Sequence, residues 1–330
     1  MRRALSGIKP TASPHVGNHL GMVMPAIALQ ESHACLYFIA DYHALTSVHD
    51  AAAMRQWTHE IAAYFMAFGL DPTRSVFYRQ SDLPEVCELA WILSCVVNMG
   101  LLERAHAWKA AKDRGNEGAE VHGLFAYPVL MAADILIHDA DVVPVGRDQV
   151  QHIEMTRDMA ERFNFTFGDT FRLPEAMVRQ EVHTVPGLDG RKMSKSYGNT
   201  VTLMQSKKAL RQQVMRMVTD STPLEDPKDP ETCNVFALYR LFASPEEVAE
   251  MAARYRAGNY GYGHAKMALA EVMEAYAAPA RERYMALLAD PQTLEEVLRD
   301  GAARARVTAR EVIDRVRSRV GFVGRGTYAG

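Results

Sequence analysis

The chain has 330 residues, of which 48% are hydrophobic and 23% charged, and its formal net charge is −3. This length suits two domains, and the composition is typical of a globular protein, not of a disordered or fibrous one. No segment resembles a secretory signal, and no apolar run reaches the roughly 20 residues that a membrane span needs. The cysteines lack metal-ligand spacing. We therefore expect reduced thiols, a cytoplasmic location and no membrane partner.

The first half of the chain alternates short apolar runs with longer segments of helical spacing. The expected strands are residues 4–8, 35–40, 76–78 and 141–145, and the expected helices are residues 18–31, 50–68 and 84–102. This alternation predicts a doubly wound, Rossmann-like α/β fold with a parallel sheet, whose ligands bind at the carboxyl ends of the strands. Pro25 is expected to kink the first helix.

After about residue 200 the strand signals end and residues rich in Ala, Glu, Arg and Met follow. They predict helices over residues 245–256, 266–288 and 291–320. We therefore expect a catalytic domain over residues 1–203 and a helical domain over residues 204–330. Seven arginines lie between residues 304 and 325. They indicate either a surface that attracts a polyanion or the solvated face of a terminal helix.

The segment Lys192–Ser196 combines two lysines and two serines behind the glycines of residues 187–190. Lysine is a mobile charge suited to a triphosphate, and serine hydroxyls can donate to phosphate oxygens. Flanking glycines allow such a loop to close over a nucleotide. The segment therefore predicts an ATP-binding loop, although a basic surface loop has a similar composition.

Residues 15–18 lie between an expected strand and an expected helix, where backbone amides form an anion site. Gly17 would let a nucleotide approach the backbone closely. His15 and Asn18 could donate hydrogen bonds to phosphate oxygens, or either could only cap the helix.

These two segments together resemble the signatures of class I aminoacyl-tRNA synthetases. Residues 15–18 resemble the HIGH signature, with Asn18 in its last position, and Lys192–Ser196 resembles the KMSKS signature without a mismatch. The resemblance implies that His15, Asn18, Lys192 and Lys195 are catalytic. It implies that the nucleotide also contacts the following residues: Lys9, Pro10, Thr11, Gly17, Gly146, Arg147, Asp148, Val185, Met193, Ser194 and Ser196.

Residues 124–135, 143–152 and 154–164 closely resemble bacterial tryptophanyl-tRNA synthetases, and the likeness extends from about residue 4 to about residue 320. A buried carboxylate at Asp134 would accept the indole N–H and reject substrates that lack it. The other residues implied for tryptophan are Met131, Val143 and Val145 as apolar walls, Tyr127 and Gln149 at the amino group, and His43 and Leu5. For Met131 and the valines, ordinary core packing is the alternative.

The family resemblance implies that ATP activates L-tryptophan to an adenylate, with release of pyrophosphate, and that tryptophan then passes to tRNA(Trp). Mg²⁺ would arrive with ATP, and we expect no protein-held metal and no tightly bound cofactor. The helical region would recognise the anticodon, in keeping with the arginine-rich end, and the protein would be a homodimer. Lys9 stands where the bacterial pattern commonly has glutamine. It either adds a cation near the ATP phosphates or points into solvent.

Three competing interpretations have to be tested. A tyrosyl-tRNA synthetase shares the fold and both nucleotide signatures, but the segment from Gly146 to Asp158 favours tryptophan. A non-aminoacylating paralogue would have no use for an intact KMSKS loop. A small-molecule adenylyltransferase would leave the long helical half unexplained.

Overall fold

The structure, a computed structural model, describes residues 1–105, 108–109, 121–178 and 185–323. Its five-stranded parallel sheet has the order β3-β2-β1-β4-β5. The strands are β1 Arg3–Ile8, β2 Ala34–Ile39, β3 Val76–Arg79, β4 Val142–Val145 and β5 Glu175–Val178. This order reverses direction between β1 and β4, which is where a doubly wound sheet binds its ligand. The predicted fold class is confirmed, as are the four predicted strands, whereas β5 was not predicted.

The α-helices follow in chain order, with a gap in the numbering where residues are not described. They are α1 Val16–Asn18, α2 Met24–Ala28, α3 Asp41–Ala44, α4 Ala51–Ala67, α5 Glu85–Ser94, α6 Met99–Glu103, α8 His122–Leu136, α9 Val150–Phe167, α10 Lys207–Met215, α11 Asn234–Tyr239, α12 Pro245–Ala257, α13 Tyr262–Ala289 and α14 Pro291–Val320. Local sequence explains several ends. Asp50 caps α4 by accepting hydrogen bonds from two backbone amides, and Ser244 forms a capping box at α12.

Two predicted helices are irregular in the structure. The helix expected over residues 18–31 contains a π-helical turn, His19–Val23, directly before Pro25. Proline lacks an amide donor and crowds the preceding turn, so a widened turn relieves the conflict. The helix expected over residues 84–102 is wrong as a single element. It is divided into α5 and α6 because Asn98 has extended backbone angles, φ −82° and ψ 139°.

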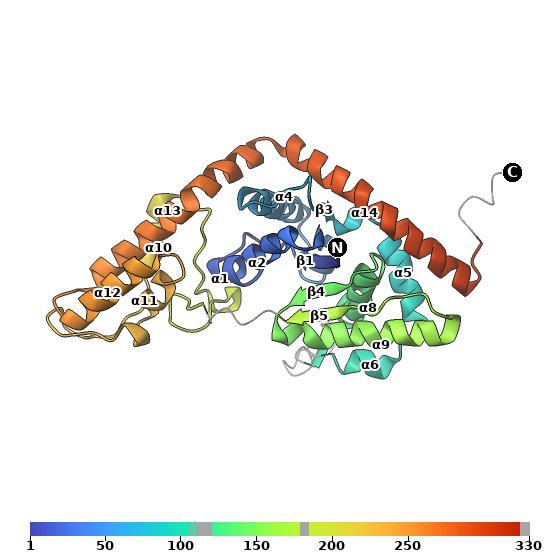
Figure 1. Cartoon of the computed structure of the whole chain (residues 1–330), viewed down its shortest axis with the longest axis horizontal. Coiled ribbons are helices and arrows are strands. Elements are labelled where there is room, and N and C mark those ends of the chain that lie inside the picture. The colour runs from blue at the N-terminus through green and yellow to red at the C-terminus, as the bar shows by residue number, and fades with distance from the viewer. Residues whose placement is uncertain (106–107, 110–120, 179–184, 324–330) are drawn as a thin grey trace.

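The last helix, α14, runs back from the helical region across the α/β half (Figure 1). It packs against β3, α4 and α5. Gly301 allows α14 to approach β3 closely, because a Cβ atom at this position would lie 1.8 Å from the backbone oxygen of Phe77. Residues 185–203, in contrast, pack on the core of the helical region. The division of function at residue 203 therefore stays a prediction.

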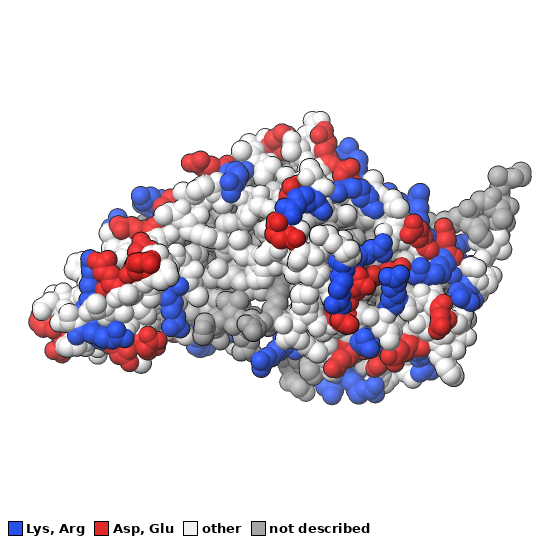
Figure 2. Space-filling view, in the orientation of Figure 1, with Lys and Arg blue, Asp and Glu red and all other residues white. Residues whose placement is uncertain are grey.

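The arginines of α14 are engaged within the molecule. Arg315 pairs with Asp139 at 2.7 Å, and Arg317 pairs with Glu88. Arg304, Arg306 and Arg319 donate to backbone oxygens of the α/β half. Figure 2 shows acidic and basic side chains intermixed in this part of the surface. Whether these arginines contact tRNA stays a prediction, and Arg325 lies outside the described residues.

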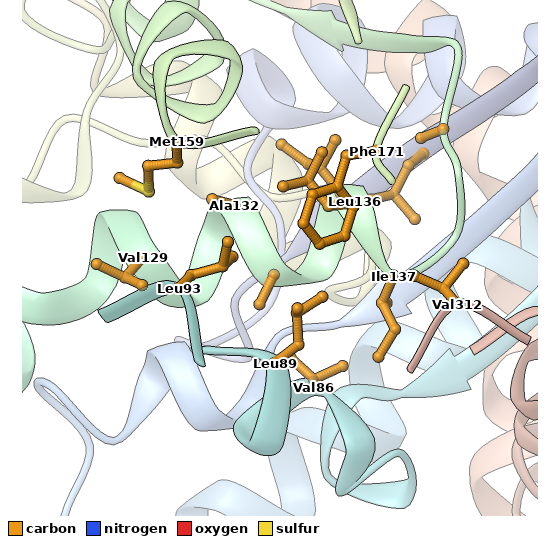
Figure 3. Packing of buried hydrophobic residues seen from close by; sticks show 14 of the residues in the cluster. Val86, Leu89, Leu93, Val129, Ala132, Leu136, Ile137, Met159, Phe171 and Val312 are labelled. Atoms are coloured by element: carbon orange, nitrogen blue, oxygen red, sulfur yellow. The ribbon is translucent and has the colours of Figure 1, made fainter. Parts of the chain in front are cut away.

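Buried apolar side chains fill both faces of the sheet. Figure 3 shows one cluster, in which Leu89 of α5, Leu136 of α8 and Val312 of α14 point into a shared core. A second cluster joins α10, α11, α12 and α13. No helix in the described ranges is long and apolar enough to cross a membrane.

Candidate active site

A cavity of about 580 Å³ opens beside the carboxyl end of β1, a volume in the range usual for small-molecule sites. Its lining includes seven residues predicted for tryptophan: Leu5, His43, Tyr127, Met131, Asp134, Val143 and Gln149. Lys9, predicted for ATP, also lines it. Val145 is buried in the core and does not line the cavity. The lining also includes Gly7, Phe38, Ala40, Leu124, Ile135 and His152, which the sequence interpretation did not assign to tryptophan.

Asp134 projects from α8 and is only 2% exposed. Its Oδ2 lies 2.8 Å from His43 Nε2, and Gln80 Nε2 donates to both carboxylate oxygens, at 2.8 and 2.9 Å. Burial raises the pKa of Asp134, and the hydrogen bonds from His43 and Gln80 partly oppose that rise. Gln80, fully buried after β3, was not predicted as a site residue.

The carboxylate of Asp134 retains room for a ligand. Two carboxylate oxygens together accept about four hydrogen bonds. The described part of the chain supplies three, two to Oδ2 and one to Oδ1. One acceptor position on Oδ1 is thus available at the wall of an otherwise largely apolar cavity.

The polar side of the cavity is formed by Tyr127, His152 and Lys9. The Tyr127 hydroxyl lies 2.8 Å from His152 Nε2, and burial raises the pKa of this phenol to about 12, so it is neutral. The ammonium of Lys9 lies 5.8 Å from the centroid of the Tyr127 ring. Burial lowers the pKa of Lys9. The residue is nevertheless exposed, so Lys9 borders the cavity and is also open to solvent.

The KMSKS-like loop is fixed to the HIGH-like segment by direct contacts. Met193, which is 4% exposed, accepts a hydrogen bond through its Sδ from the Gly17 amide at 3.4 Å. The Val16 amide donates to the Val201 oxygen at 2.8 Å, and the Met193 amide donates to the Val185 oxygen at 2.9 Å. Two segments that are about 180 residues apart in the chain therefore form one structural unit.

Lys195 reaches across to the turn that follows β1. Its ammonium donates to the Thr11 oxygen at 2.7 Å and to the Ala12 oxygen at 3.3 Å. Ala12 has φ 82°, an unusual conformation for a residue with a Cβ atom. Because Lys9 lies on the same turn, the loop is adjacent to the cavity. Lys192 and Ser196 are exposed on the loop.

Asn199 anchors the loop from inside and was not predicted. It is 3% exposed, and its Oδ1 accepts from the Ser194 amide at 2.8 Å. Its Nδ2 donates to Asp189 Oδ1 at 2.6 Å and to the Lys192 oxygen at 3.2 Å. One buried side chain therefore fixes the backbone on both sides of Met193.

His15 is buried at the start of α1, where its Nδ1 accepts a hydrogen bond from the Asn18 amide at 3.3 Å. Burial, assisted by the charge of Lys195, lowers the pKa of His15 to about 4. The ring is therefore neutral near pH 7 and carries its proton on Nε2, which can donate to an anion. His15 thus caps the helix and also presents a donor. A Cβ atom at Gly17 would lie 3.0 Å from this ring, so a larger residue there would press on the imidazole.

The remaining residues predicted for ATP lie just after β1 and β4. Pro10 is buried on the turn after β1, while Gly146 and Arg147 are exposed just beyond β4. The side chain of Asp148 lies outside the described residues. In the parts of the chain that the structure describes, no cluster of three His, Cys, Asp or Glu residues could hold a metal ion.

Residues 1–277 match the family described as tRNA synthetases class I (W and Y). Sheet order, cavity and paired signature segments accordingly define a class I tRNA synthetase. A tryptophan–tRNA ligase of Rhodopirellula baltica is 52% identical over 320 residues, which cover 97% of this chain and 99% of that protein. One from Campylobacter jejuni is 47% identical and is covered completely.

Solved structures agree with this assignment. The crystal structure of tryptophanyl-tRNA synthetase from Campylobacter jejuni, complexed with ADP and tryptophan, has a TM-score of 0.93 and 47% identity, and the match covers 97% of this chain and 100% of that one. The chain belongs to the bacterial tryptophanyl-tRNA synthetase family. A tyrosyl-tRNA synthetase from Archaeoglobus fulgidus, with TM-score 0.64 and 19% identity, shares the fold alone.

Proposed function

We propose that this protein is a tryptophan–tRNA ligase that activates L-tryptophan with ATP and then transfers it to tRNA(Trp). The observation that carries the proposal is the available acceptor position of buried Asp134 in an apolar cavity adjoining the KMSKS-like loop. An indole N–H can occupy that position. The hydroxyl of tyrosine is also a donor, so the choice of tryptophan over tyrosine rests on this acceptor together with the tryptophan–tRNA ligases that the chain resembles over almost its whole length.

In the first step, a tryptophan carboxylate oxygen attacks the α-phosphorus of ATP. The bond between that phosphorus and the oxygen bridging to the β-phosphate breaks, and pyrophosphate leaves. Such a reaction needs alignment and charge neutralisation more than covalent help from the protein. Lys192, Ser194 and Lys195 supply positive charge and donors on the side of the leaving pyrophosphate.

The opposite side of the triphosphate meets the HIGH-like segment. The Nε2 proton of neutral His15 and the amide group of Asn18 donate to phosphate oxygens there. Lys9, at the cavity wall beside Tyr127, lies between the amino-acid cavity and the loop. We assign it to the α-phosphate or the tryptophan carboxylate, the two anions that meet in the reaction.

In the second step, a hydroxyl of the terminal tRNA ribose attacks the acyl carbon and AMP leaves. Mg²⁺ enters as part of the ATP complex and compensates phosphate charge. A role in translation implies a cytoplasmic location and anticodon recognition by the region after residue 204. We also infer a homodimer, on the strength of family membership.

The test is ATP–pyrophosphate exchange with each amino acid, followed by charging of tRNA(Trp). Exchange with tryptophan and charging of tRNA(Trp) are expected. Exchange with tyrosine alone would identify a tyrosyl enzyme, and exchange without charging would indicate a paralogue that no longer acts on tRNA.

A further inference from the structure

A long segment without acidic residues follows the ATP loop. Between Asp189 and Asp220 the chain contains seven Lys and Arg residues and no Asp or Glu, although its net charge is −3. Three of these cations belong to the loop. The other four are Lys207, Lys208, Arg211 and Arg216, on and just after α10. The structure therefore concentrates positive charge on one helix beside the active site.

The cations of α10 are exposed and not engaged in ion pairs. Lys208, Arg211 and Arg216 are all exposed, and none of the ion pairs among the described residues includes them. They border a hollow of about 590 Å³, together with Gln212 and Met215. Lys207 differs from these three residues, because it interacts electrostatically with Glu274.

The basic residues of α10 and α14 differ in the contacts that they already make within the molecule. Arg315 and Arg317 pair with carboxylates, and Arg304 donates to backbone oxygens. An arginine engaged in such contacts must lose them before it can bind a phosphate. Lys208, Arg211 and Arg216 make no such contacts with the residues that the structure describes, so binding a polyanion costs them mainly side-chain entropy.

The inner face of α10 is tied to the active site. Gln213 Nε2 donates to the Thr200 oxygen at 2.8 Å, and the Thr202 amide donates to Gln213 Oε1 at 3.3 Å. Thr202 forms a β-bridge with His15. A polyanion held on the outer face of α10 would thus rest on an element joined to the HIGH-like segment.

We propose that the exposed face of α10, formed by Lys208, Arg211 and Arg216, binds the phosphate backbone of tRNA. A phosphodiester chain carries regularly spaced charges, and lysine and arginine bind phosphate with favourable geometry. The proposal rests on the proposed function, since tRNA is the polyanionic substrate of a tryptophan–tRNA ligase. It assigns affinity, not anticodon reading, to this helix, because phosphate contacts carry no sequence information.

The test compares the parent enzyme with the variant Lys208→Gln/Arg211→Gln/Arg216→Gln. A control, Arg162→Gln/Arg172→Gln/Arg299→Gln, removes the same charge from exposed arginines elsewhere that form no ion pair among the described residues. Binding of a tRNA(Trp) transcript is measured by fluorescence anisotropy from 50 to 300 mM salt. Tryptophan-dependent ATP–pyrophosphate exchange, which needs no tRNA, is measured in parallel.

We expect the α10 variant to bind tRNA about tenfold or more weakly. The plot of log affinity against log salt should become shallower, its slope decreasing in magnitude by about 2 to 3. Exchange should stay unchanged, and the control should bind as the parent does. Unchanged affinity in the α10 variant, or an equal loss in the control, overturns the proposal. If the triple variant unfolds, the single variants Lys208→Gln and Arg211→Gln decide, each expected to lower the slope by about 1. Absence of exchange in the parent would reject the proposed function instead.

Discussion

The imidazole of His43 lies 2.8 Å from the carboxylate of Asp134, and both groups are buried at the wall of the cavity proposed to bind tryptophan. They come from two different helices, since His43 belongs to α3 and Asp134 to α8. Gln80, just after β3, completes the arrangement with two further hydrogen bonds. The carboxylate is thereby fixed in orientation, and one of its acceptor positions stays available.

Replacing Asp134 with Asn should weaken the recognition of tryptophan and change the stability of the fold little. An amide of the same shape accepts less strongly than a carboxylate, so kcat/KM for tryptophan should fall about ten- to hundredfold. Because burial raises the pKa of Asp134, its ionised form is disfavoured in the folded state. The neutral variant should therefore unfold within about 1 kcal/mol of the parent.

Exchange kinetics with varied tryptophan and urea denaturation measure these two effects. The KM for ATP should change less than the KM for tryptophan. An unchanged kcat/KM for tryptophan would remove Asp134 from indole recognition.

Lys195→Ala should abolish most adenylate formation without unfolding the protein. The side chain supplies charge to the leaving pyrophosphate, and loss of one such group typically lowers the rate by about 10²–10³. The residue is exposed, but its ammonium donates to two backbone oxygens, so the free energy of unfolding should fall by about 1 kcal/mol or less. Arg191→Ala is the matched control, because Arg191 is a cation of the same loop but pairs with Asp189 at 2.6 Å. Equal activity of the two variants in pyrophosphate exchange would contradict the assignment.

Asn199→Ala should disturb ATP binding, although Asn199 itself is not among the residues predicted to contact ATP. The substitution leaves the Ser194 amide and the Lys192 oxygen without their present partner, at a cost of about 1–3 kcal/mol. The loop should lose its shape, so the KM for ATP should rise several-fold while the KM for tryptophan stays nearly constant. The exposed loop residue Tyr197, replaced by Phe, serves as control. A matching rise in both KM values would mean that Asn199 supports the whole domain.

Two fully buried histidines should make the fold sensitive to acid. Burial lowers the pKa of His19 to about 4 and that of His138 to about 3, below the usual value of about 6.5. Below pH 6.5 the unfolded chain therefore binds protons that the folded chain does not, and stability falls. The loss is up to about 1.4 kcal/mol per pH unit for each group.

Urea denaturation at pH 7, 6 and 5 should show a smaller pH slope for His19→Gln/His138→Gln than for the parent. The double variant loses packing at every pH, so the slope and not the absolute stability is the measurement. His49→Gln/His122→Gln, at exposed positions, should keep the parental slope. A parental slope in the buried-site variant would show that other groups cause the acid sensitivity.

The sequence was sufficient for the strands that are continuous apolar runs, and insufficient for β5. The segment Glu175–Val178 is exposed at both ends and lies at the sheet edge, so it carries no long apolar run. The break between α5 and α6 was also missed, because neither glycine nor proline marks residues 95–98. The local signal was Asn98, which is the N-cap residue of α6 and a residue type that favours this position.

The residues of the candidate site likewise fall into two groups, those that the sequence predicted and those that it missed. Motif residues such as His15 and Lys195 could be named because their spacing is distinctive. Gln80 and Asn199 act through partners distant in the chain or through loop geometry that no motif encodes. A polar residue at the carboxyl end of a strand, as Gln80 is after β3, was the one available signal. For Asn199 the sequence offered none.

Gly301→Ala should be among the most destabilising single methyl additions in the protein. The added Cβ atom would lie 1.8 Å from the Phe77 oxygen, so α14 would have to move away from β3. Overpacking of this kind costs about 1–3 kcal/mol, and contact with rigid backbone places this site at or above the upper end. The matched control is Gly263→Ala in α13, where no atom lies within 4 Å of the new Cβ atom. That variant should be as stable as the parent or more stable by up to about 1 kcal/mol, because alanine favours the helix. Thermal unfolding of both variants measures the difference, and equal melting temperatures would refute the close packing of α14 on the sheet.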